Sequence, residues 1–168
     1  ANGALTPEEV DSCAELFEGA GLVLLQLEIP LDCIAGAIQL AKRSGARVVL
    51  NPSPIIADLP LKEWNVDYLV VNEVEAQTLA GNAKSFEESV HLLAPKSRNV
   101  ILTRGRESTL VKEGNASLKG IPAFAVDPVD TVGAGDTFAG ALATALGEGR
   151  DLPSAVRFAN AAGALATR

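Results

Sequence analysis

The chain has 168 residues, of which 48% are hydrophobic and 21% charged, as is usual for one globular domain with a core of its own. Asp and Glu outnumber Lys and Arg by 21 to 14, and the net charge of −7, with no basic run, argues against nucleic acid and anionic membranes as partners. Cys13 and Cys33 lack metal-ligand spacing and His91 is the only histidine, so neither a disulfide framework nor a zinc site is expected.

Helical patterns and short apolar runs alternate from the start of the chain. Thr6 is a plausible N-cap and Pro7 suits a first helical position, so the sequence predicts a helix over 7–17, followed by a buried strand over 22–27. The next predicted elements are a helix over 31–43, strands over 47–50, 68–71 and 99–102, and helices over 73–80 and 86–93. Apolar strands joined by helices indicate a parallel sheet covered on both faces.

The last third of the chain has a different pattern. Residues 108–111 and 116–118 predict a β-hairpin, and two Ala-rich segments over 134–146 and 153–166 predict helices that pack closely. No repeat or linker marks a second domain, so residues 1–168 are expected to form one three-layer α/β/α Rossmann-like domain with a mostly parallel sheet. No apolar run approaches the roughly 20 residues of a membrane span and no signal peptide is evident, so a cytoplasmic location is expected.

A glycine-rich turn precedes the helix predicted over 134–146. Gly133 and Gly135 allow the backbone to approach a ligand, and the amides of Ala134, Gly135 and Asp136 would point at a phosphate. Asp136 would repel that phosphate unless it has a chemical task, such as taking a proton from a hydroxyl nucleophile. The turn therefore indicates phosphoryl transfer to an alcohol. The alternative is a flexible strand-to-helix connection in which Asp136 only favours the helix dipole.

Segment 130–146 resembles the C-terminal signature of the ribokinase family, the phosphofructokinase-B type sugar kinases. Further similar motifs follow in the family's order, at 26–31, 51–54, 71–76 and 102–105. Among the branches of the family, the ribokinases fit best. The resemblance implies an enzyme that uses ATP to phosphorylate the terminal hydroxyl of ribose, giving ribose 5-phosphate. Asp136 would then be the base, with Gly133, Ala134 and Gly135 around the transferred phosphate.

The other candidate residues follow predicted strands, at the edge of the sheet where ligands of such folds bind. By resemblance, Asn72 belongs to the nucleotide site and Glu75 organises Mg²⁺ through water, although the two residues also form a capping-box pattern that would stabilise any helix. Thr103 and Gly105 are expected to contact the nucleotide, with an ordinary turn as the alternative. Ser108 replaces a glycine common in the family, and Arg104 and Arg106 add positive charge there.

Three further positions have roles only by resemblance. Glu28 would hydrogen-bond a sugar hydroxyl, or is simply an exposed acid. Asn160 would line the adenine pocket, or lies on a solvated helix face. Asp130 and the carbonyl of Val132 correspond to a site for a monovalent cation, K⁺ in the complete enzyme, whose remaining ligands would lie beyond Arg168.

The resemblance covers the middle and C-terminal parts of such kinases. The N-terminal strands, the β-lid and most sugar contacts would be missing, so the chain is expected to be a fragment with little activity alone. The alternative is a non-catalytic nucleotide-binding module, or a half-protein that needs a partner chain. Missing strands would leave an unpaired sheet edge, which predicts a homo-oligomer formed through that edge.

Overall fold

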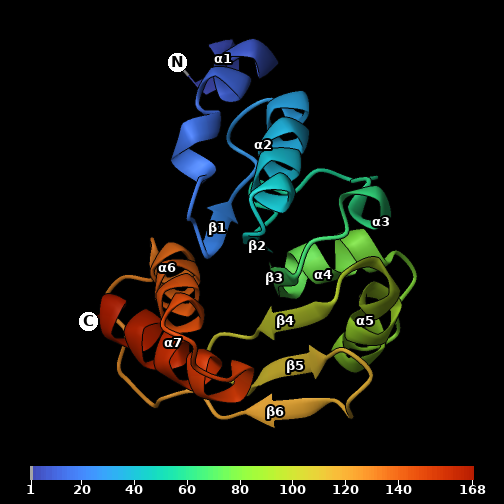
Figure 1. Ribbon diagram of the computed structural model, residues 1–168. Coiled ribbons are helices and arrows are strands. Elements are labelled where there is room, and N and C mark those ends of the chain that lie inside the picture. The colour runs from blue at the N-terminus through green and yellow to red at the C-terminus, as the bar shows by residue number, and fades with distance from the viewer. Residues whose placement is uncertain (1) are drawn as a thin grey trace.

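The computed structural model describes residues 2–168, which form a mixed sheet of six strands with helices on both faces (Figure 1). The strands lie side by side in chain order, β1 (Leu22–Leu25), β2 (Arg47–Leu50), β3 (Tyr68–Asn72), β4 (Asn99–Thr103), β5 (Thr109–Glu113) and β6 (Lys119–Ile121). The first four strands are parallel, and β5 and β6 continue the sheet in antiparallel pairing. The expected α/β architecture is confirmed.

The helices divide between the two faces of the sheet (Figure 1). Their bounds are α1 Pro7–Ser12, α2 Leu31–Arg43, α3 Leu61–Trp64, α4 Glu73–Ala80, α5 Phe86–Leu93, α6 Ala134–Gly147 and α7 Leu152–Ala166, with 3₁₀ turns at Asn2–Ala4, Ala14–Phe17 and Ala94–Lys96. Residues of α2 to α5 pack in one core cluster, whereas α6 and α7 form another with the opposite face of the sheet.

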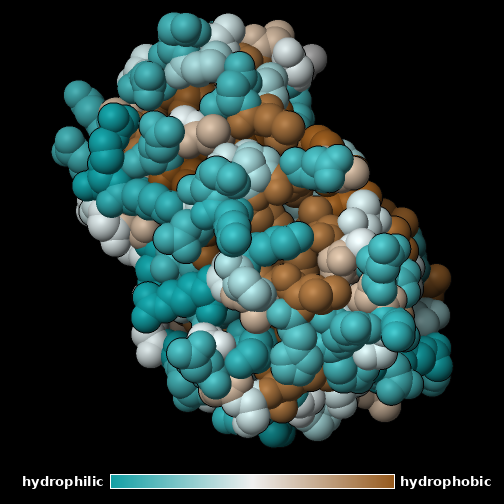
Figure 2. All heavy atoms as spheres, turned by 90° about the vertical axis from the view of Figure 1, so that its right-hand side faces the viewer, coloured by the Kyte–Doolittle hydropathy of each residue, from teal (hydrophilic) through white to brown (hydrophobic). Residues whose placement is uncertain are grey.

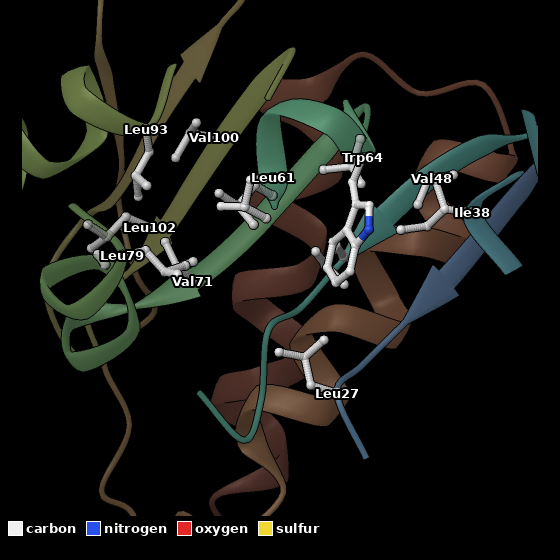
Figure 3. Close-up of a cluster of buried hydrophobic side chains, with 14 of the residues drawn as sticks. Leu27, Ile38, Val48, Leu61, Trp64, Val71, Leu79, Leu93, Val100 and Leu102 are labelled. Carbon is white, nitrogen blue, oxygen red and sulfur yellow. The ribbon is translucent and has the colours of Figure 1, made fainter. Parts of the chain in front are cut away.

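Alternation along the strands explains the two clusters. Val48 and Leu50 of β2 point into the cluster of α2 to α5, while Val49 between them packs with α6 and α7. Because successive side chains of a strand point to opposite faces, a continuous apolar run serves both layers. In Figure 3, Trp64 of α3 lies within the larger cluster, together with Ile38 of α2 and strand residues such as Val48.

Side-chain caps place several of the helices. Asn72 caps α4 in a capping box with Glu75, Ser85 caps α5, and Asp151 caps α7. Helix α6 differs, because it begins after Gly133 in the left-handed region, at a φ of 76°, without a side-chain cap. This start leaves polar backbone groups of α6 free for other partners.

The structure corrects several predicted boundaries. The helix expected over 7–17 breaks after Ser12 and continues as a 3₁₀ turn, which places Cys13 outside a helix. The first strand ends at Leu25, and the hairpin strands lie one to three residues later than expected. The single turn of α3 was not predicted, because Leu61 and Trp64 are separated by too few residues to establish a helical period.

The surface is mixed. Seen from the side on which α3 and α5 lie in Figure 1, a band of apolar side chains runs between polar ones (Figure 2). Within residues 2–168 no helix has the length and apolar character required to cross a membrane.

Candidate active site

Polar residues follow the parallel strands at one edge of the sheet. Gln26 follows β1, Asn51 follows β2, and Asn72 and Thr103 end β3 and β4. The start of α6 lies at the same edge, as the residues that line two cavities there demonstrate. The larger cavity has a volume of about 360 Å³ and the smaller one about 220 Å³. They share walls made by Asn72, Thr103, Gly135 and Phe138, so they are neighbours.

The first turn of α6 presents backbone donors to both cavities. The amide of Ala134 donates to the carbonyl of Thr131, with an N–O distance of 3.3 Å. Among the backbone hydrogen bonds of residues 2–168, the amides of Gly135 and Asp136 have no carbonyl partner. Of the three predicted phosphate-binding amides, these two are therefore free, whereas Ala134 is already engaged in a long hydrogen bond.

The Asp136 carboxylate is exposed and points away from the core. Its Oδ1 accepts a hydrogen bond of 2.7 Å from Nε2 of Gln26. The same Nε2 lies 3.5 Å from Oδ1 of Asn51, whose Nδ2 donates to the carbonyl of Val70 at 3.1 Å. This chain of contacts connects the catalytic candidate to β1, β2 and β3.

Gln26 was not predicted as a site residue, although it belongs to one of the motifs that resemble the family. Its position immediately after a predicted strand was a usable signal, since ligand-facing residues of open α/β sheets gather there. What the sequence could not reveal is that an amide 110 positions before Asp136 contacts that carboxylate.

Asn72 and Glu75 form the predicted capping box. The amide of Asn72 donates to Oε2 of Glu75 and the amide of Glu75 donates to Oδ1 of Asn72, both at 2.9 Å. Glu75 is nevertheless buried at 4% exposure, and it lines the smaller cavity together with Asp136. Burial raises the pKa of Glu75, more than hydrogen bonds from Asn72 and Ser53 lower it. The predicted capping role is thus confirmed, and Glu75 also lines the smaller cavity.

Thr103, Gly105 and Asn160 all line the larger cavity. The Asn160 side chain is buried, with its Oδ1 accepting from the Thr109 hydroxyl at 2.8 Å and its Nδ2 donating to the carbonyl of Pro122 at 3.1 Å. The alternative that Asn160 lies on a solvated helix face is therefore wrong. Its hydrogen bonds join α7 to β5 and to the segment after β6, so Asn160 also shapes the cavity wall.

Three predicted residues are not among those that line the cavities. Glu28 is exposed, and its Oε2 lies 3.4 Å from Nδ2 of Asn2. Asp130 turns back on itself, because its Oδ1 accepts a 2.9 Å hydrogen bond from the amide of Val132, whose side chain is 83% exposed. Within residues 2–168, no group of three or more His, Cys, Asp and Glu side chains is arranged to hold a metal ion.

Comparisons of sequence and of structure both match this chain to ribokinases. The chain is 36% identical to a ribokinase of Staphylococcus aureus, in an alignment that covers 98% of this chain and 56% of that protein. The structure of a Thermotoga maritima ribokinase superimposes with a TM-score of 0.86 and 32% identity, covering 99% of this chain and 56% of that one. An Arabidopsis thaliana ribokinase complexed with ribose and ATP gives a TM-score of 0.82 and 30% identity, with 94% and 53% covered.

The chain thus spans about half the length of the proteins that it matches. The family model described as pfkB family carbohydrate kinase matches residues 1–168. Because that match covers the whole chain, including the glycine-rich turn before α6, the chain belongs to the pfkB family of carbohydrate kinases.

Proposed function

We propose that this chain is the nucleotide-binding and base-bearing part of an ATP-dependent sugar kinase that converts ribose to ribose 5-phosphate. The observation that carries the proposal is the exposed Asp136 carboxylate in the smaller cavity, one residue from the free amide of Gly135, which lines both cavities. A hydroxyl acceptor and a phosphate donor need such neighbouring sites, because an in-line transfer requires both to meet at the same phosphorus.

In the proposed step, Asp136 takes the proton of the sugar hydroxyl as its oxygen attacks the γ-phosphorus of ATP. The bond from that phosphorus to the bridging oxygen of ADP breaks, and the amides of Gly135 and Asp136 stabilise the negative charge on the transferred group. The Gln26 amide would hold the Asp136 carboxylate in place through its 2.7 Å hydrogen bond. Gly133 gives the turn the left-handed conformation that starts α6.

The larger cavity is the proposed nucleotide site. Its apolar wall, which includes Phe124, Val126 and Phe138, suits a nucleotide base. Thr103 also lines the smaller cavity, so it lies where the proposed nucleotide site adjoins the cavity of Asp136. The Arabidopsis relative with ribose and ATP bound supports this choice of substrates. Asn160 would support nucleotide binding indirectly, because its hydrogen bonds to Thr109 and Pro122 hold the cavity wall in place.

The metal proposal rests on the buried Glu75. Mg²⁺ keeps several waters and takes phosphate oxygens as ligands, so a single carboxylate acting through water, with Asn72 beside it, fits the donors that line the smaller cavity. When bound there, Mg²⁺ would neutralise charge on the nucleotide phosphates. Asp130 and the Val132 carbonyl supply too few oxygens for a complete K⁺ site, so we expect no tight K⁺ binding by this chain.

Ribose is the proposed acceptor sugar. Glu28 would meet a sugar hydroxyl only with the remaining sugar-binding residues in place, because it lies outside both cavities here. A cytoplasmic location belongs to the same proposal. Because the matched relatives are nearly twice as long, we expect the isolated chain to position the acceptor hydroxyl poorly.

The second candidate is a non-catalytic nucleotide-binding module, or a half-protein completed by another chain. It is favoured by the coverage of only 56% of the Staphylococcus aureus relative. Both candidates bind ATP, but only the enzyme needs the Asp136 carboxylate.

Calorimetric titration with MgATP, followed by a coupled assay with ribose, tests the proposal. We expect weak ATP binding and slow ribose phosphorylation, and we expect Asp136→Asn to retain ATP binding while losing roughly 10²–10⁴-fold in turnover, the usual contribution of a general base. Fast phosphorylation by the isolated monomer would contradict the expected low activity. A turnover that Asp136→Asn leaves unchanged would refute Asp136 as the base, and absence of ATP binding would exclude both candidates.

A further inference from the structure

The charged residues of the two cavities are sorted by sign. Of the charged residues within 2–168, only Arg104 and Arg106 line the larger cavity. Within the same part of the chain, only Glu75 and Asp136 carry charge in the lining of the smaller one. The two cations therefore line a cavity wall without an acid in a chain that has an excess of seven negative charges. The larger cavity therefore favours an anionic ligand.

Arg104 has a local structural task. Its Nε donates to the carbonyl of Ser108 at 2.9 Å, and its own carbonyl accepts from the amide of Glu107 at 2.9 Å. These hydrogen bonds close the turn between β4 and β5, with Gly105 in the left-handed region at a φ of 56°. The turn is thereby held with Ser108 at the position where a glycine was expected.

Arg106 stands at the exposed part of this closed turn. Its guanidinium takes part in none of the hydrogen bonds, ion pairs or cation–π contacts found among residues 2–168. A guanidinium presents several donors in a fork that matches phosphate oxygens. Because the turn fixes the backbone of Arg106 beside the larger cavity, little of that backbone has to be ordered when an anion binds.

We propose that Arg106 binds the phosphate groups of the nucleotide and makes the larger cavity select phosphorylated nucleotides over the nucleoside. The inference rests on the proposed function, since it assumes that the larger cavity holds the nucleotide. It adds a specificity-determining side chain to the cavity that Ala134 and Gly135 of α6 also line.

The test compares ADP with adenosine by calorimetric titration of the whole chain. We expect Arg106→Ala to weaken ADP binding roughly 10-fold, the size of a charge-assisted hydrogen bond at an exposed site, and to leave adenosine binding unchanged. Arg106→Lys should recover part of the loss. Arg43→Ala is the matched control, because it removes the same charge from an exposed site on α2.

The outcomes separate the inference from the proposed function. If wild type binds neither ADP nor adenosine, the proposed function fails, and the inference fails with it. If wild type binds ADP and Arg106→Ala binds it equally well, only the inference is overturned. An equal loss of ADP and adenosine affinity would also overturn it, because a collapsed cavity wall would affect both ligands. A loss of the same size in Arg43→Ala would mean that net charge, rather than Arg106, attracts the nucleotide.

Discussion

Glu75 and Asp136 line the same cavity, but they are held in different environments. Glu75 is buried and accepts a hydrogen bond from the backbone amide of Asn72. Asp136 is exposed and accepts a hydrogen bond from the side-chain amide of Gln26. These different environments suit two different proposed roles, in which Glu75 organises a metal ion and Asp136 transfers a proton.

Burial of Glu75 has a consequence for stability. Its pKa is raised above the ordinary value of 4.5, so the native state holds the proton more tightly than the unfolded state does. The free energy of unfolding should therefore fall as pH rises from about 4.5 through the raised pKa. Glu75→Gln keeps an acceptor for the Asn72 amide but removes this titration, so its stability should depend less on pH in that window.

Urea denaturation at a series of pH values, from about 4.5 to neutral, measures this effect. Glu73→Gln, which removes the same charge from the first turn of α4, is the matched control. Parallel pH profiles for wild type and Glu75→Gln would contradict the prediction.

Among the helices and strands, the most accurate predictions were of segments with a regular apolar pattern and recognisable capping or turn residues at their ends. Helices over 31–43, 73–80 and 86–93 and the strand over 47–50 were predicted with their observed bounds. The break after Ser12 and the single turn of α3 could not be found in the same way, because tertiary packing decides such short segments.

The same difference applies to the site. Residues that end strands or start helices were found from local sequence. Contacts between distant segments, such as Gln26 with Asp136 or Asn160 with Thr109, were not. Register and side-chain direction across the sheet decide those contacts, and a single sequence carries little information about them.

The two caps at Asn72 and Ser85 allow the role of α4 to be tested. Both side chains accept a hydrogen bond from the third residue of their helix, at 2.9 Å in α4 and 3.1 Å in α5. Replacing either by Ala should reduce the free energy of unfolding by about 1 kcal/mol. Only Asn72 lines the cavities, so we expect only Asn72→Ala to weaken MgATP binding as well.

Thermal or urea unfolding with parallel titrations of MgATP checks this pair. Equal ATP affinities in the two variants, at similar losses of stability, would mean that Asn72 is a helix cap and nothing more.

In the molecule as a whole, the unpaired edge of β1 is the feature that most favours association with another chain. Within residues 2–168, β1 pairs only with β2, so its other edge has no strand beside it. Leu24 in this strand is 36% exposed. Exposed apolar edge strands favour pairing with another chain. We therefore expect two copies of the isolated chain to associate through β1.

Light scattering over a range of concentrations should give a mass that rises above the 17.4 kDa of the monomer. Leu24→Lys should reduce this rise, because a charge on an edge strand opposes pairing. Leu165→Lys, at an exposed position on α7, is the control and should behave as wild type. A monomer at every concentration would contradict the expected association.

The central claim is that the start of α6 holds a phosphate beside Asp136. Amide chemical shifts, followed by NMR during titration with ADP and with adenosine, test it most directly because they report on the donors themselves. We predict that the amide resonances of Gly135 and Asp136 shift strongly with ADP and little with adenosine. If ADP binds while these two resonances stay in place, the phosphate is bound elsewhere and the start of α6 is not the phosphate site.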